Sequence, residues 1–179
     1  MKLLGLCGSL RAASTNHALL QAAAREVPAG LSFTVFEGLG AVPLFSPDAN
    51  EVVPAPESVQ ALRRAVAEAD GIVVACPEYA HGIPGAFKNA LDWIVGSNEM
   101  TDKPVTLLAA SLPPRGVLVR EALVEVLGAM SARLILDCCA AVPLMGKRPE
   151  ESERILAEAA HRETLRSCLE RFATAIRAL

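Results

Sequence analysis

The chain is poor in aromatic residues and has no marked excess of charge of either sign. Aromatic residues make up 4% of its 179 positions, and 17 basic residues against 20 acidic ones give a formal net charge of −3. A basic surface is what nucleic acids and anionic membranes require, and its absence argues against both as partners. No stretch approaches the ~20 consecutive apolar residues of a membrane span. We therefore expect small molecules or other subunits as partners.

The cysteines are odd in number and lack metal-type spacing. There are five, with no CxxC pair, which argues against a disulfide framework and a zinc site. We expect reduced, mostly buried thiols and no metal. The apolar run that follows Lys2 ends at Cys7 and is shorter than the roughly 7–15 apolar residues of a secretory signal, so we expect a cytoplasmic protein.

The pattern of apolar residues predicts one α/β domain that covers residues 1–179. The length matches one domain of about 150 residues. Strands are predicted at residues 2–7, 31–37, 71–76, 104–110 and 132–136. Helices are predicted at 16–26, 59–69, 83–95 and 118–130, with a long amphipathic helix from about 149 to the end. Strict alternation of strand and helix implies a parallel, doubly wound sheet with helices on both faces.

The order of the strands follows from the second one. Residues 31–37 alternate apolar and polar side chains, as in a strand with one solvent-exposed face. This alternation predicts an edge position. This fits a five-stranded sheet in the order 2-1-3-4-5, whereas in the order 3-2-1-4-5-6 the second strand would be interior. Residues 38–56 carry four prolines without helical periodicity and are predicted to form a long surface loop.

The turn after the first strand is rich in polar groups and precedes a helix. It is neither GxGxxG nor a Walker loop, which argues against a dinucleotide domain and an NTPase. Its polar residues are Ser9, Arg11, Ser14, Thr15 and Asn16. Hydroxyls, an amide and a guanidinium in front of a helix N-terminus suit a phosphate monoester. Ser14 or Thr15 is also the expected N-cap of the helix. The alternative to a phosphate site is that these two residues do nothing more than cap the helix while Arg11 is solvated.

The loop after the third strand, residues 77–85, combines proline, glycine and polar residues in a way that a simple strand-to-helix connection does not need. Pro77 stiffens it, whereas Gly82 and Gly85 permit close approach by a flat ligand. Glu78 and Tyr79 offer polar and aromatic contacts at the strand end.

Two such loops flank the switch point of a 2-1-3-4-5 sheet, where flavin mononucleotide (FMN) binds. For three other residues a purely structural role is an alternative to contact with a ligand. His81 is as readily an exposed loop residue as a substrate contact, and Phe87 and Trp93 suit the core or a subunit contact.

The two loops together resemble the NADPH-dependent FMN reductase family of flavodoxin-like proteins, which includes quinone, chromate and azo-dye reductases. The motifs that carry the resemblance are Gly8-Ser-Leu-Arg-x-x-Ser-x-Asn16 and Pro77-Glu-Tyr-x-x-Gly-Ile-Pro-Gly-x-x-Lys-Asn-Ala-Leu-Asp-Trp93. The resemblance implies that Ser9, Arg11, Ser14 and Asn16 hold the FMN phosphate. It also implies that Pro77, Glu78, Tyr79, Ala80 and Gly82 border the isoalloxazine ring, with Ser111 nearby.

The chain departs from the family pattern at two places. Family members commonly have asparagine where this chain has Ala80, so one side-chain contact near the ring is altered. After the fourth strand they often carry a glycine-rich run, whereas residues 111–116 read Ser-Leu-Pro-Pro-Arg-Gly. A stiffer loop there implies a different shape of the substrate pocket.

The resemblance also implies a function. It predicts that hydride passes from NADPH or NADH through flavin N5 to a small electrophilic acceptor, in a homodimer or homotetramer. The flavin supplies the reactivity, so no catalytic side chain is predicted. The alternative is a non-enzymatic FMN-binding electron carrier or redox sensor. A cysteine phosphatase of similar fold needs Cys-x5-Arg, but Ala13 stands where Cys7 would require arginine.

Overall fold

A parallel sheet forms the centre of the computed structural model, which describes residues 1–179. Its strands are β1 (Lys2–Cys7), β2 (Ser32–Val35), β3 (Gly71–Ala75), β4 (Pro104–Ala109), β5 (Arg133–Leu134) and β6 (Ala140–Ala141). All strand pairs are parallel, in the order β2-β1-β3-β4-β5, with β6 also paired to β4. The predicted order 2-1-3-4-5 is therefore confirmed.

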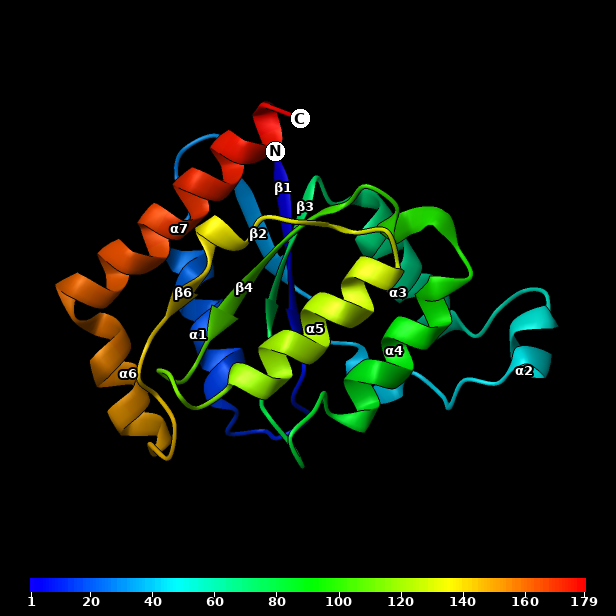
Figure 1. Cartoon of the computed structure of the whole chain (residues 1–179), viewed down its shortest axis with the longest axis horizontal. Helices are drawn as coiled ribbons and strands as arrows, with labels where there is room; N and C mark the ends of the chain where they lie inside the picture. Colours follow the sequence, from blue (N-terminus) through cyan, green and yellow to red (C-terminus); the bar gives the residue numbers. More distant parts are fainter.

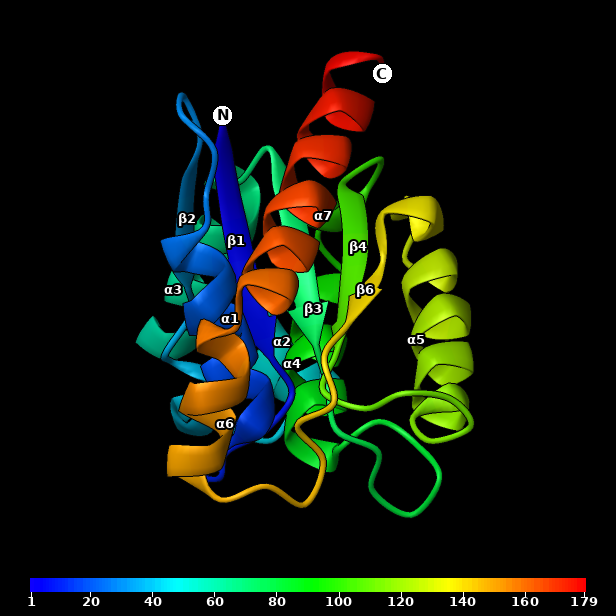
Figure 2. The same cartoon turned by 90° about the vertical axis from the view of Figure 1, so that its left-hand side faces the viewer.

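Helices cover both faces of the sheet. They are α1 (Thr15–Arg25), α2 (Pro47–Glu51), α3 (Glu57–Glu68), α4 (Gly85–Val95), α5 (Val117–Ala129), α6 (Pro149–Ala157) and α7 (Ala159–Arg177). Three 3-10 turns are η1 (Leu39–Ala41), η2 (Asn98–Met100) and η3 (Leu136–Cys138). Figure 1 shows α1, α6 and α7 on one side of the sheet and α3, α4 and α5 on the other, and Figure 2 shows the same layers from a second side.

β3 is the most deeply buried strand, and its side chains supply both cores. Ile72 and Val74 point into the core under α3, α4 and α5, whereas Val73 and Ala75 point into the core under α1, α6 and α7. A strand buried on both faces needs apolar residues at every position, which explains the run Gly-Ile-Val-Val-Ala. Phe87 and Trp93 of α4 are each 1% exposed and belong to the interior, so the core interpretation of these residues is confirmed.

β2 lies at the edge of the sheet, as its alternating sequence predicts. Exposed and half-buried positions alternate along Ser32–Val35, and only β1 pairs with it. Phe33 packs across Gly5 of β1, where an ideal Cβ would lie 2.8 Å from the Phe33 ring. A glycine in the neighbouring strand thus makes room for the large side chain of the edge strand.

The predicted fifth strand at 132–136 is wrong in its extent. Regular pairing covers only β5, after which the chain forms η3 and returns to β4 as β6. The buried Thr106 of β4 explains the break, because its hydroxyl donates a hydrogen bond of 3.1 Å to the Ile135 carbonyl. A side chain thereby takes an acceptor that a continuing parallel ladder would use.

Three other boundaries also differ from prediction. The segment 38–56 is not all loop, since Ser46 caps α2 by accepting a hydrogen bond of 3.1 Å from the Ala49 N–H. The C-terminal helix is two helices, α6 and α7, because Glu158 has the extended angles φ −62° and ψ 135°. Pro84 is the N-cap of α4 and precedes its first turn.

No helix has the length and apolar character needed to cross a lipid bilayer.

A buried carboxylate joins the end of α1 to α7. Glu26, 7% exposed, accepts hydrogen bonds from Arg162 Nε at 2.6 Å and Arg166 Nη2 at 2.9 Å. These hydrogen bonds, first that of Arg162, hold the pKa of the Glu26 carboxyl below its ordinary value. The ion pairs therefore tie two helices on the same face of the sheet.

We predict that Glu26→Gln lowers the melting temperature, by an amount that depends on pH. Because the folded-state pKa of Glu26 is depressed, its stabilisation is complete above the unfolded-state pKa of about 4.3 and is lost as the pH falls through the folded-state value. Thermal unfolding of both proteins from pH 7 to pH 3 should show the difference shrink with acidity. The exposed Glu125→Gln is the control, and a pH-independent difference would contradict the prediction.

Candidate functional site

The carboxyl ends of β1, β3 and β4 border a cavity of about 750 Å³. This volume is within the roughly 300–1,000 Å³ of small-molecule sites. Its walls come from residues 9–16, 74–81, 107–123 and 139–146, each in part. The cavity thus lies where the order of the sheet reverses between β1 and β3, as expected for a doubly wound fold.

Most of the predicted site residues line this one cavity. They are Ser9, Arg11, Ser14, Asn16, Pro77, Glu78, Tyr79 and Ser111. Ala80 and Gly82 lie in the same loop but do not line it. The turn after β1, the loop after β3 and the segment after β4 therefore converge, although they are far apart in the sequence.

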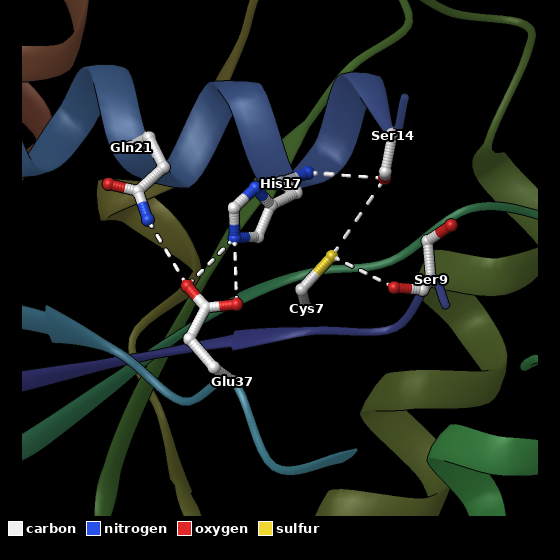
Figure 3. Close-up of polar contacts among 6 residues, drawn as sticks. All are labelled: Cys7, Ser9, Ser14, His17, Gln21 and Glu37. Carbon is white, nitrogen blue, oxygen red and sulfur yellow. Dashed lines mark hydrogen bonds and ion pairs between the residues drawn. The ribbon is translucent and has the colours of Figure 1, made fainter. Parts of the chain in front are cut away.

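Ser14 organises the turn after β1, as Figure 3 shows. It is the N-cap of α1, and its Oγ accepts a hydrogen bond of 3.2 Å from the His17 N–H. The capping role expected for Ser14 is therefore confirmed. The N–H groups of Thr15 and Asn16 have no acceptor within the helix, because the first turn of a helix lacks preceding carbonyls. These two N–H groups are therefore free hydrogen-bond donors at the cavity wall.

Asn16 carries an unsatisfied polar atom into the site. The residue is 6% exposed and lines the cavity, and its Oδ1 has no hydrogen-bond partner. A buried amide oxygen without a donor is costly, by about 1–3 kcal/mol. A ligand that brings a hydroxyl or another donor to this position would remove that cost.

His17 and Glu37 connect α1 to the end of β2 behind the turn (Figure 3). His17 Nε2 lies 2.9 and 3.1 Å from the two Glu37 carboxylate oxygens, and Gln21 Nε2 donates to Glu37 at 3.3 Å. Neither His17 nor Glu37 lines the cavity. These contacts position the start of α1 and leave the cavity face of the turn free.

The two cysteines at the strand ends are packing residues. An ideal Cβ on Gly8 would lie 2.4 Å from Cys76 Sγ, so only glycine allows the ends of β1 and β3 to approach this closely. Burial raises the pKa of Cys76 to about 12 and also raises the pKa of the Cys7 thiol. A nucleophilic cysteine needs a lowered pKa, so the structure agrees with the sequence in rejecting a cysteine phosphatase.

The loop after β3 contains a tight two-residue turn. Tyr79 and Gly82 exchange two backbone hydrogen bonds of 3.1 and 3.0 Å, while Ala80 and His81 have φ angles of 49° and 62°. Two left-handed residues in a hairpin turn define type I′, in which asparagine and glycine are favoured. The departure at Ala80 therefore places alanine at a left-handed position that favours asparagine or glycine.

Glu78 has a structural role that its sequence context does not predict. One carboxylate oxygen accepts a hydrogen bond of 3.2 Å from the Val119 N–H in the first turn of α5, and the other lies 3.5 Å from His81 Nδ1. α5 has no cap of its own, since Gly116 precedes it with φ 76°. The absence of a capping side chain before an apolar helix was the available signal that a distant group supplies the cap.

Other wall residues also escaped prediction. Ala140, Ala141, Met145 and Gly146 line the cavity from β6 and the segment after it. They reach the site only because β6 pairs with the carboxyl end of β4, a pairing that the apolar pattern of the sequence does not predict.

We predict that Ala80→Asn stabilises the protein by about 1 kcal/mol, because asparagine tolerates the left-handed conformation better than alanine. This corresponds to a rise of roughly 2–4 °C in the melting temperature of a chain of this size. The control is Ala157→Asn at an exposed position of α6, which should lower the melting temperature. A similar loss in both variants would contradict the assignment of the turn.

Comparisons with known proteins agree with this geometry. Residues 1–145 match the model of the NADPH-dependent FMN reductase family. The quinone reductase of Escherichia coli K12 is 30% identical over 114 residues, which are 63% of this chain and 61% of that protein. The NAD(P)H-dependent FMN reductase of Pseudomonas aeruginosa is 36% identical over 113 residues, 62% of this chain and 60% of that one. The chain thus matches about three fifths of the length of these relatives.

Solved structures share the fold at lower identity. The flavoenzyme NAD(P)H:(acceptor) oxidoreductase FerB of Paracoccus denitrificans superimposes with a TM-score of 0.75 at 24% identity, covering 99% of this chain and 97% of that one. A flavodoxin, WrbA-like protein from Agrobacterium tumefaciens gives 0.57 at 19% identity, with coverages of 99% and 97%. The fold is therefore flavodoxin-like. Since the family model spans residues 1–145 of 179, the chain belongs to the NADPH-dependent FMN reductase family.

Proposed function

We propose that this protein is an FMN-dependent NAD(P)H oxidoreductase. Hydride would pass from NADPH or NADH to a small electrophilic acceptor such as a quinone, an azo dye, a metal oxyanion or free flavin. The observation that carries the proposal is the cavity at the switch point, where the turn after β1 and the loop after β3 meet in a member of this family.

The turn after β1 fits the phosphate of FMN. Ser9, Arg11, Ser14 and Asn16 would hold it, together with the free N–H groups at the start of α1. The Ser14 oxygen accepts the capping bond and lies 3.9 Å from Cys7 Sγ, a weak acceptor, so its hydroxyl hydrogen would turn to a phosphate oxygen when one binds. Arg11 is exposed and has no carboxylate partner. The unpartnered Asn16 Oδ1 would accept a hydrogen bond from a hydroxyl of the ribityl chain.

The loop after β3 would border the flavin ring. Its proposed contacts are Pro77, Glu78, Tyr79, Ala80 and Gly82, with Ser111 from the segment after β4. The turn at 79–82 is closed by two backbone hydrogen bonds, and Glu78 anchors the loop to α5. Such a rigid wall suits a planar ligand, since little ordering is needed when it binds.

Bound FMN would supply the hydride chemistry, and the residues of this chain would bind and orient the reactants. No side chain is assigned as acid or base. The donor and the acceptor would enter the same cavity in turn, which predicts ping-pong kinetics.

We also propose a homodimer or homotetramer. Large apolar side chains are exposed around α2, with Leu44 at 85% and Val53 at 91%. This segment projects from the body of the protein in Figure 1, and α2 has no buried residue. The apolar face of α4 is not available for an interface, because its large side chains lie in the core. The α2 segment is therefore the better candidate surface.

We also propose a cytoplasmic location, which the state of the cysteines supports. All five cysteines are free, and Cys7, Cys138 and Cys168 are buried. Unpaired cysteines are typical of a reducing compartment, where disulfides rarely persist.

The test is an anaerobic visible spectrum of the purified protein with FMN, recorded before and after reduced nicotinamide is added. We expect a bound-flavin spectrum that bleaches. A bound flavin that stays oxidised would favour the electron carrier or sensor, and an absence of flavin binding would overturn the proposal.

We predict that Arg11→Gln weakens FMN binding about tenfold or more, since a hydrogen bond to a charged group contributes roughly 1.5–3 kcal/mol. Quenching of flavin fluorescence measures the dissociation constant. Arg64→Gln on the exposed face of α3 makes the same charge change away from the cavity and should bind FMN as the wild type does. Equal affinities in both variants would remove Arg11 from the phosphate site.

A further inference from the structure

The cavity wall differs in charge from the protein as a whole. Three arginines line it, Arg11, Arg115 and Arg120, and Glu78 is its single carboxylate. The whole chain, by contrast, has a formal net charge of −3. Positive charge is therefore concentrated where ligands enter, and this points to an anionic ligand.

The arginines lack internal partners. None of the three forms an ion pair within the chain. Glu78 is already engaged by the Val119 N–H and His81. The side chain of Arg115 has a single polar contact, Nη1 to Met145 Sδ at 3.5 Å, and a thioether is a weak acceptor. The guanidinium groups keep nearly all their donors free.

The position of Arg115 is set by its own loop. The Ser111 hydroxyl donates a hydrogen bond of 3.3 Å to the Arg115 carbonyl, and Pro113 and Pro114 fix the backbone just before it. Gly116, with φ 76°, then turns the chain into α5, where Arg120 lies in the first turns. The stiff loop that departs from the family pattern therefore holds a cation at the cavity.

FMN carries one phosphate, and the turn with Arg11 accounts for it in the proposed function. Arg115 and Arg120 lie on a different segment, after β4, and remain for another anion. We propose that Arg115 and Arg120 form an anion subsite for the ligand that enters after FMN. A guanidinium group binds two oxygens of a phosphate, sulfonate or carboxylate at once, so the recognised group is an oxyanion of this kind. It belongs either to NADPH, as its 2′-phosphate, or to the acceptor.

The subsite rests on the proposed function, and its test is the double variant Arg115→Gln/Arg120→Gln loaded with FMN. Calorimetric titration with NADP⁺ and NAD⁺ measures binding without turnover. Steady-state kinetics then compare NADPH with NADH, and anthraquinone-2-sulfonate with the neutral quinone menadione. Arg64→Gln is the control for charge, and FMN affinity is measured in each protein.

If the 2′-phosphate is the anion, the double variant should lose the preference for NADP⁺ over NAD⁺ by about tenfold or more, with the quinone preference unchanged. If the acceptor supplies the anion, the preference for the sulfonated quinone should fall instead. Unchanged preferences for both pairs would overturn the subsite while leaving the reductase intact. Failure of NADPH and NADH to reduce the bound flavin would overturn the reductase, but the NADP⁺ titration would still test the subsite.

Discussion

The burial of β3 on both faces is the constraint from which the architecture follows. A strand with no solvent-exposed face must be covered by helices on both sides of the sheet. Parallel strands can be joined only by crossover connections. The chain therefore runs outward from β1 in one direction to β2, and in the other to β3, β4 and β5. The crossovers on the two sides of this reversal leave on opposite faces, so no helix fills the space above the ends of β1 and β3. The cavity is what this topology leaves open.

The walls of the cavity are then held by contacts that no single segment could make alone. Gly8 brings the end of β1 against Cys76 at the end of β3. Glu78 joins the loop after β3 to the start of α5. Ser14 caps α1 from the turn that it also shapes. Because each loop is fixed to a neighbouring element, the polar groups face the cavity in a rigid arrangement, which lowers the entropy lost when a ligand binds.

The sequence predicts this fold well where the signal is local. The apolar run of β3, the alternation in β2 and the cap at Ser14 each depend on a few adjacent residues, and all three are confirmed. The errors arise where a distant side chain decides. Thr106 ends the strand pairing at Ile135, and no residue near position 135 in the sequence indicates that the strand ends there. The break at Glu158 is also hidden, because the helical periodicity of apolar residues continues on both sides of it.

The candidate site shows the same division. The two motif loops are evident from the sequence, yet the contribution of β6 and the cap at Glu78 depend on pairings across the fold. The left-handed turn at Ala80 is a further case, since a hydrogen-bonded pair outside it, Tyr79 and Gly82, imposes a backbone that alanine does not favour.

The distribution of charge determines the step at which anions are distinguished. A protein with a net charge of −3 does not attract anions over long distances, and at physiological ionic strength charges separated by more than about 8 Å are largely screened. The cavity arginines therefore act only on a ligand that has already reached the cavity mouth. Selection between an anionic ligand and its neutral analogue must then appear in how long each stays bound, not in how often each arrives. A negative exterior around a positive cavity thus favours retention of anionic ligands without collecting polyanions on the surface.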